Sequence, residues 1–371
     1  MQDWSQITGG LAMQHIRQLI ADGHIKNAAE SHLQPSSLDL SLSDEIYRMR
    51  GTFLPRRGET IRDILKDGIL YQTRLDHPLE LFGIYLVRLD QTLSLPEQVY
   101  AITNNKSSSG RINLQTRLLV DGTARFDTVP KGYQGEVWLE ITPKSFPVKL
   151  GHGERLNQMR FMTADTRLTS QEHFALLDRS ELLCDLSGNA LKADLSLVDY
   201  DGIAMSVDLS SEDIVGYKCS PTACRVLDYS RRDLDAREFF EPIHRPTNRQ
   251  YVMKQGDFYI FVTKEGLRVP GNYAAEMAAY DPSKGEFRSH YAGFFDPGFG
   301  HGLNGEVRGT PAVLEIFTHD NDFVLRDGQP ICKMVYSRLA SPAQTLYGDT
   351  RLASNYYKQQ GPRLSKHFKM S

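Results

Sequence analysis

Hydrophobic and polar positions indicate short strands along the first half of the chain. Leu and polar residues alternate over residues 37–42, while residues 81–89 and 135–142 add further strand-like runs, the last with only rough alternation. A period of two is the pattern of a β-strand with one face buried. Turn-forming residues separate the runs, at Pro96, Gly110, Gly122 and Gly132. Many short strands at such spacing predict a mostly β fold, a sandwich or a distorted barrel, rather than alternating βαβ units.

Two segments depart from this strand pattern. Residues 11–20 space their apolar side chains as one face of a helix does, and Gly23 is a suitable end for that helix. Residues 162–199 lose the alternation and contain a second helical pattern over residues 174–183. We interpret residues 162–199 as a segment with a helix that connects two domains.

The second half of the chain repeats the first. Ser37-Leu38-Asp39-Leu40-Ser41 recurs as Ser206-Val207-Asp208-Leu209-Ser210, at an offset of 169 (206 − 37). Phe126-Asp127 recurs as Phe295-Asp296 at the same offset. Similarity that keeps its register over separate segments indicates a tandem duplication of one domain.

A third repeat lies further along the two halves. Leu139-Glu140-Ile141 recurs as Leu314-Glu315-Ile316, now at an offset of 175 (315 − 140). We therefore predict a first domain over residues 1–161, the connecting segment over 162–199, and a second copy with a C-terminal lid segment over 200–371.

Length and composition agree with two globular domains. The chain has 371 residues, of which 40% are hydrophobic and 24% charged. A net charge of −3 argues against a general partner for nucleic acid polymers, which would need a basic surface. The N-terminus lacks the pattern of a signal peptide, and no apolar run approaches the ~20 residues of a membrane span. Four cysteines form no paired framework, so we expect a cytoplasmic protein without a membrane partner.

Two features carry candidate chemistry. The turn Lys106-Ser107-Ser108-Ser109-Gly110-Arg111 offers hydroxyls, turn amides and two cations, which suit a phosphate. Glu140 lies between Leu139 and Ile141 in a strand pattern. Apolar walls desolvate a carboxylate and raise its pKa, which makes it a usable general acid and base near neutral pH. By itself, a serine-rich turn is usually a loop, and a strand glutamate often belongs to a structural ion pair.

In their order along the chain, these motifs resemble the dCTP deaminase branch of the dUTPase superfamily. The resemblance rests on the serine-rich turn, on Ala124-Arg125-Phe126-Asp127 and on Val137-Trp138-Leu139-Glu140, and it covers about residues 11–161. It implies a tandem duplication of a dUTPase-like distorted β-barrel or jelly-roll domain with a few short helices. Because the family forms trimers, it also implies a homotrimer, a pseudo-hexamer of domains.

The resemblance implies roles for single residues. Glu140 would take a proton from the water that attacks C4 of cytosine, while Ser107 and Arg111 would position this water and the amino group. The substrate-binding residues would be Lys106, Ser108, Arg125, Asp127 and Gln359. An alternative for Arg125 and Asp127 is an internal pair that holds a turn. The triphosphate would bring Mg²⁺, so magnesium is implied through the substrate rather than through a protein site.

The second copy differs where this chemistry would lie. It keeps Glu315 but has Ala274-Ala275-Glu276-Met277 where we expect the serine-rich turn, and Phe294 in place of Arg125. We interpret it as a structural partner; the alternative is a composite site in which Ser107 and Arg111 act with Glu315. Residues 355–361, which include Gln359, resemble the family segment that closes over the triphosphate, although Asn355 stands where the family usually has Lys.

A zinc-dependent deaminase is not indicated. That class uses an H-x-E element followed by P-C-x-x-C. His152-Gly153-Glu154 has the first pattern, but Cys219 and Cys224 have four residues between them and no Pro before the first. We expect His152-Gly153-Glu154 to form a hairpin turn, and we predict no zinc.

The sequence thus favours an enzyme that deaminates dCTP to dUTP and ammonia with Glu140 as general acid and base. The alternatives are a dUTP diphosphatase, a bifunctional enzyme that carries out both steps, and a non-catalytic nucleotide-binding regulator. Glu140 favours deamination, because the diphosphatase pattern does not require a glutamate on that strand.

Overall fold

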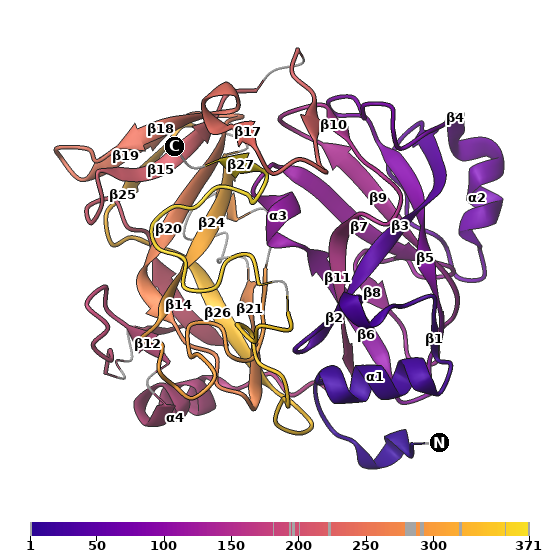
Figure 1. Ribbon diagram of the computed structural model, residues 1–371, viewed down its shortest axis with the longest axis horizontal. Helices are drawn as coiled ribbons and strands as arrows, with labels where there is room; N and C mark the ends of the chain where they lie inside the picture. The colour runs from indigo at the N-terminus through magenta and orange to yellow at the C-terminus, as the bar shows by residue number, and fades with distance from the viewer. Residues whose placement is uncertain are drawn as a thin grey trace. The chain divides into compact units, whose positions relative to one another are not determined.

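Strands far outnumber helices in the computed structural model, which confirms the predicted mostly β fold (Figure 1). The structure describes residues 2–180, 182–192, 194, 197–199, 201–221, 224–278, 287–289, 293–318, 321–352 and 354–369. Backbone contacts define two units. Unit 1 comprises Met1–Asp165 and Pro221–Leu234, and unit 2 comprises Thr166–Ser220 and Asp235–Ser371. No helix among the described residues is long and apolar enough to cross a membrane.

The main strands of unit 1 pair in the order β7-β9-β5-β3-β11-β6-β8, and every pairing along this path is antiparallel. These strands are β3 (Ser37–Met49), β5 (Tyr85–Ser94), β6 (Tyr100–Asn105), β7 (Leu114–Val120), β8 (Thr128–Val129), β9 (Gln134–Pro143) and β11 (Arg155–Met162). The remaining elements are η1 (Trp4–Gln6), α1 (Met13–Ala21), β1 (Ile25–Lys26), η2 (Glu30–His32), β2 (Leu33–Gln34), α2 (Ile61–Gly68), β4 (Ile69–Thr73), α3 (Ser107–Gly110), β10 (Val148–Lys149) and β16 (Leu227–Asp228).

The strands of unit 2 form two main sheets, with the orders β18-β15-β20-β24-β22 and β13-β14-β26-β21-β23. Their bounds are β13 (Val198–Asp199), β14 (Gly202–Ser206), β15 (Ile214–Cys219), β18 (Phe240–His244), β20 (Phe258–Leu267), β21 (Tyr273–Ala278), β22 (Phe287–Ser289), β23 (Phe294–Phe295), β24 (Thr310–Thr318) and β26 (Pro330–Arg338). The other elements are α4 (Ser170–Ser180), β12 (Leu183–Cys184), β17 (Leu234–Asp235), η4 (Ala236–Glu238), β19 (Gln250–Met253), β25 (Phe323–Arg326) and β27 (Phe368–Lys369).

Most of the predicted elements are present, with shifted bounds. The predicted N-terminal helix is α1, which buries Ile16 and Leu19. The strand predicted from residue 81 begins only at Tyr85, because the Gly83 amide donates to the Glu80 carbonyl (3.0 Å) and closes a turn first. The predicted connecting segment holds α4, whose Leu177 packs in the core of unit 2.

Strand β9 does not alternate between buried and exposed positions as its sequence pattern suggests. Every residue from Val137 to Pro143 is buried, so both faces of the strand are covered. Its neighbours β5 and β7 satisfy the backbone polar groups on its two edges. A charged side chain in this part of β9 is therefore withdrawn from water.

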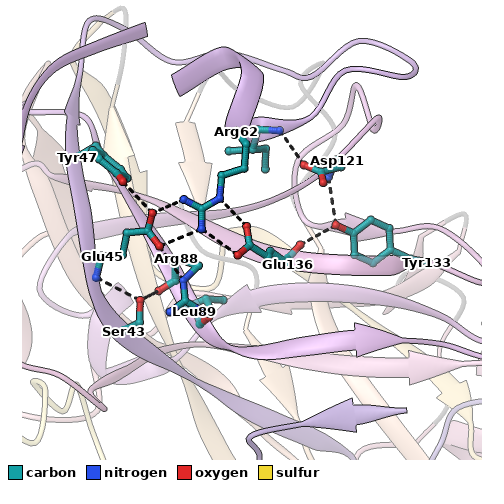
Figure 2. A network of polar contacts seen from close by, with 10 residues as sticks. Ser43, Glu45, Tyr47, Arg62, Arg88, Leu89, Asp121, Tyr133 and Glu136 are labelled. Atoms are coloured by element: carbon teal, nitrogen blue, oxygen red, sulfur yellow. Dashed lines mark hydrogen bonds and ion pairs between the residues drawn. The ribbon is translucent and has the colours of Figure 1, made fainter. Parts of the chain in front are cut away.

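Helix α2 is absent from the predicted elements, although Ile61, Ile64 and Leu65 have helical spacing, and an ion-pair network fastens it to the sheet of unit 1 (Figure 2). Arg62 donates from Nε to Glu136 (2.9 Å) and from Nη1 to Glu45. The Arg62 guanidinium also lies 4.8 Å from the ring centroid of Trp138. Ile61 packs in the same apolar cluster as that ring. Charge and packing together hold α2 beside the middle of β9.

The strand ladders correct the register of the predicted duplication. The Gly153 amide donates to the Leu42 carbonyl (2.8 Å), and the Gly328 amide donates to the Val207 carbonyl (2.9 Å). Leu42 therefore corresponds to Val207, at an offset of 165 (207 − 42), and the match of residues 37–41 to 206–210 at 169 is wrong by four positions. The offset of 175 between Glu140 and Glu315 is confirmed, because Glu140 pairs with Leu86 as Glu315 pairs with Ile260.

Two further matches are also wrong. Thr103 donates its amide to the Asp127 carbonyl (3.0 Å) as Met277 does to the Gly293 carbonyl (3.1 Å), so Asp127 corresponds to Gly293 rather than to Asp296. By that offset the counterpart of Arg125 is residue 291 rather than Phe294, and it lies outside the described residues.

The predicted counterpart of the serine-rich turn is likewise displaced. Residues 274–277 lie within β21 and correspond to residues 100–103, since Ala275 pairs with Tyr336 as Ala101 pairs with Phe161. The true counterpart of the turn falls after Ala278, where the structure describes no residues until 287. Insertions between strands shift the register, and short sequence matches cannot detect them.

The anchoring of α2 gives a prediction. We expect Arg62→Ala to lower the free energy of unfolding by roughly 1–2 kcal/mol, because it removes partly exposed ion pairs and a cation–π contact together. Arg74→Ala is the matched control, since Arg74 forms an ion pair with Asp76 on the open surface (2.7 Å). Urea denaturation should show a lower midpoint for the first variant only. Equal midpoints in the two variants would contradict an anchoring role for Arg62.

Candidate active site

The serine-rich turn Lys106–Arg111 is built around α3 and held by one acceptor in β11. The Leu156 carbonyl accepts the Lys106 amide (2.9 Å) and the Ser109 hydroxyl (3.0 Å). The backbone of the turn closes on itself, and the Ser109 amide donates to the Lys106 carbonyl (2.9 Å). The turn therefore has a defined shape rather than that of an open loop.

The side chains of the turn differ in their access to solvent. Ser108 and Arg111 are buried, while Ser107 is half-buried. The Lys106 ammonium donates to the buried carboxylate of Asp39. A phosphate at this turn would share the Lys106 charge with Asp39, which lowers the net attraction for an anion.

Glu140 lies in the middle of β9, opposite Leu86 of β5 and Arg117 of β7, and is 6% exposed. Burial raises the pKa of its carboxyl above the ordinary value of 4.5, although a hydrogen bond from Thr52 and the charge of Arg117 oppose this rise. Among the described residues, Oε2 of Glu140 has no hydrogen-bond partner. The predicted desolvated carboxyl is thus present in the structure.

Asp127 has a structural position close to that carboxyl. Its backbone has a φ of 56°, and its Oδ1 accepts the Leu118 amide (2.8 Å) and the Thr103 hydroxyl (3.0 Å). Burial raises the pKa of Asp127 to about 6, and its charge in turn raises the pKa of Glu140. Asp127 thus holds the loop between β7 and β8, whereas Arg125 lies exposed on that loop.

Three residues around Glu140 are not predicted from the sequence: Thr52, Arg117 and Lys144. Thr52 follows β3 in a segment without a recognisable motif, and Arg117 is one polar residue within an apolar strand. Burial lowers the pKa of Lys144, while the charge of Glu140 raises it. Only the cross-strand register could have indicated Arg117, because it faces Glu140 in the ladder.

Gln359 lies in unit 2, together with the rest of the tail. Its side-chain amide donates to the Pro311 carbonyl (2.9 Å), and the residue is buried. Residues 358–361 border a cavity of about 600 Å³, which Asp208 and Arg308 also line. The segment expected to close over a triphosphate thus borders a cavity of unit 2.

The part of the chain that the structure describes offers no cluster of metal ligands. There, no three His, Cys, Asp or Glu side chains gather in a way that could hold a metal ion. His152-Gly153-Glu154 lies in a turn, as expected, and Gly153 has a φ of 75°.

The environment of Asp127 predicts how stability depends on pH. Its folded pKa of about 6 lies above the ordinary 3.8, so between these values the folded chain binds more protons than the unfolded chain. The contribution of Asp127 to the free energy of unfolding therefore falls as the pH rises from about 4 to 6, and it stays low above pH 6. Asp127→Asn keeps the acceptor and tolerates the positive φ. We expect the free energy of unfolding of this variant to exceed that of the wild type by on the order of 1–2 kcal/mol at pH 7.

Urea denaturation between pH 4 and pH 7 checks this prediction. The Asn variant should show a flatter dependence on pH than the wild type, and Asp127→Ala, which loses both hydrogen bonds, should be less stable at every pH. An Asn variant that is less stable than the wild type at pH 7 would show that the folded state favours the charged carboxylate.

Known proteins are similar to this chain over residues of both units. The family models for 2'-deoxycytidine 5'-triphosphate deaminase match residues 7–165 with their N-terminal domain and residues 170–368 with their C-terminal domain. The chain is 36% identical to the 2'-deoxycytidine 5'-triphosphate deaminase from Agrobacterium tumefaciens in its crystal structure. That similarity covers 91% of this chain and 100% of the other, with a TM-score of 0.82.

Curated relatives named "dCTP deaminase, dUMP-forming" match a shorter part of the chain. The relative from Mycolicibacterium gilvum is 29% identical over 38% of this chain and 70% of its own length. The relative from Halobacterium salinarum is 31% identical over 32% of this chain and 56% of its own length. The relative from Methanobrevibacter smithii is 25% identical over 36% of this chain and 65% of its own length. The chain thus spans about 56–70% of these relatives. The two matching domains and the solved structure place it in the dCTP deaminase family of the dUTPase superfamily, as the order of its motifs predicts.

Proposed function

We propose that this protein hydrolyses dCTP to dUTP and ammonia, with Glu140 as general acid and base. The observation that carries the proposal is the desolvated carboxyl of Glu140, 6% exposed in the centre of β9. It occurs in a chain that is similar over 91% of its length to a protein named as a deaminase of this nucleotide. A raised pKa brings the carboxyl towards neutrality, where it can both accept and donate protons.

The reaction needs two proton transfers through one group. Water adds to C4 of the cytosine ring while Glu140 removes one of its protons and passes it to N3. The remaining hydroxyl proton then moves through Glu140 to the amino group, the C4–N bond breaks, and ammonia leaves. C4 becomes the carbonyl carbon of uracil, and Glu140 returns to its starting state.

The turn supplies the other groups. Ser107 and Arg111 position the attacking water and the amino group, and loss of such preorganised donors typically costs about 10²–10³ in rate. Lys106 and Ser108 bind phosphate oxygens, with the Lys106 charge shared with Asp39.

The remaining substrate contacts come from the loop before β8 and from the tail. Arg125 and Asp127 contact the sugar and the base, and Gln359 belongs to the segment that closes over the triphosphate. The substrate carries Mg²⁺ on its phosphates. The chains assemble as homotrimers.

The low exposure of Glu140 suggests that the chain moves when substrate binds. Thr52 hydrogen-bonds to the carboxyl, and Phe53 packs against the apolar cluster that contains Trp138. We expect the segment that carries Thr52 and Phe53 to move aside when water and the cytosine ring reach Glu140. Substrate binding therefore includes a conformational step.

A second candidate is the bifunctional reaction that ends at dUMP. The observation that favours it is the name "dCTP deaminase, dUMP-forming", which the relatives from Mycolicibacterium gilvum and Halobacterium salinarum share. Incubation with dCTP separates the candidates, because dUTP should accumulate with ammonia in the first case and dUMP in the second. A non-catalytic nucleotide-binding regulator would yield neither product.

Substitution of Glu140 tests the proposed chemistry. We expect Glu140→Gln to reduce kcat for ammonia release at least 10²-fold with little change in KM, because the amide keeps the shape but cannot accept a proton. Glu315→Gln is the matched control: it holds the corresponding ladder position in unit 2, is also 6% exposed, and should stay within a few-fold of wild type. A dead Glu315→Gln beside an active Glu140→Gln would favour the composite site and contradict the assignment.

Metal removal tests the reaction class. We expect activity to survive a zinc-selective chelator and to fall when magnesium is withdrawn, because the triphosphate needs a counter-ion and the P-C-x-x-C element is missing. The measurement is the rate of ammonia release after each treatment. Activity lost on zinc chelation and restored by one equivalent of zinc would contradict the prediction.

A further inference from the structure

A strap from the second half of the chain belongs to unit 1. The strap comprises Pro221–Leu234, of which the structure describes residues 221 and 224–234, and its strand β16 pairs in parallel with β10. The Leu227 amide donates to the Pro147 carbonyl (2.8 Å), and the Tyr229 amide donates to the Lys149 carbonyl (3.0 Å). These backbone bonds fix the strap beside the segment that links β9 to β11.

The strap brings the Tyr229 hydroxyl to the serine-rich turn. Tyr229 is 1% exposed, and its Oη lies 3.1 Å from the Ser109 hydroxyl and 3.4 Å from the Arg155 carbonyl. The Ser109 hydroxyl donates its single proton to the Leu156 carbonyl at 3.0 Å. Ser109 therefore acts as the acceptor for Tyr229, and a chain of two hydrogen bonds runs from Tyr229 through Ser109 to Leu156.

We propose that Tyr229 is a positioning residue for the serine-rich turn, supplied to the first copy by the second half of the chain. This inference rests on the proposed function of that turn. The Leu156 carbonyl holds both the Lys106 amide and the Ser109 hydroxyl, so the bond from Tyr229 fixes the side chain that fastens the end of the turn next to Arg111. Tyr229 touches no reacting atom in this arrangement and acts through Ser109.

The hydrogen bond between Tyr229 and Ser109 is buried, so water cannot easily replace it. Ser109 is 0% exposed, so after loss of the Tyr229 hydroxyl its oxygen would lack a donor that water cannot readily replace. The Ser109 side chain could then rotate, and Ser107 and Arg111 would lose their fixed positions. Because these two residues are proposed to hold water and the amino group, the effect should appear in kcat more than in KM.

The connection between two corresponding strands has a different role in each copy. Between β3 and β5 the first copy places α2, which packs beside Trp138 in unit 1. In the second copy Tyr217 of β15 pairs with Ile260 of β20 as Tyr47 of β3 pairs with Leu86 of β5, and the strap with Tyr229 lies between β15 and β20. An excursion from the second copy thus completes the environment of the turn in the first copy.

The test is Tyr229→Phe in the full chain, which removes one oxygen and keeps the buried ring. We expect kcat for ammonia release from dCTP to fall roughly three- to tenfold, the factor expected for one buried hydrogen bond, with KM within twofold. Ser109→Ala removes the same bond from the other side and should have a similar effect. The double variant should be no worse than the more impaired single variant, because both act through one bond.

Tyr133→Phe is the matched control. Tyr133 is also buried, and its hydroxyl donates to the Glu136 carbonyl (2.6 Å) on the side of α2 (Figure 2). This variant should lose a comparable amount of thermal stability but keep kcat within twofold. Hydrogen exchange of the amides of residues 109–111 should accelerate in Tyr229→Phe and remain unchanged in the control.

Two results would overturn the role of Tyr229: a kcat in Tyr229→Phe equal to that of Tyr133→Phe, or effects of Tyr229→Phe and Ser109→Ala that multiply in the double variant. A wild-type chain that releases no ammonia would remove the proposed function instead. The hydrogen-exchange comparison would then decide the inference alone, since unchanged exchange of residues 109–111 would contradict it.

Discussion

The structure of unit 1 depends on the burial of β9 between two paired neighbours. Both edges of the strand are hydrogen-bonded and both of its faces are covered from Val137 to Pro143. One ionisable side chain in that stretch, Glu140, is thereby kept from water, and its pKa rises for that reason. Helix α2 and the segment with Thr52 contribute to this environment.

The sequence predicts those parts of the fold that local pattern determines. The strand-like runs correspond to β3, β5 and β9, and the helical spacing corresponds to α1, because these segments bury one face or two against the core. The desolvation of Glu140 follows from its apolar neighbours in the strand. Helix α2 has helical spacing too, at Ile61, Ile64 and Leu65, but it is only eight residues long, and Arg62 and its partners hold it through charge as well as through apolar area.

Features that depend on pairing at long range could not be predicted in this way. The duplication is visible in the sequence, yet its register near Asp39 and Asp127 differs from the sequence match, because loops of unequal length separate the paired strands. Thr52 and Arg117 reach Glu140 from other strands and loops. The contact of Tyr229 with Ser109 joins residues 120 positions apart, and no local motif marks it.

A crystal structure of the full chain carrying Glu140→Gln with dCTP bound would test the central claim most directly, because turnover would be blocked while the shape of the site is kept. We expect the triphosphate to lie against the turn Lys106–Arg111 and the residue-140 amide to lie about 3 Å from the amino group or water at C4. Cytosine bound beside Glu315, or a nucleotide that does not contact the turn, would contradict it.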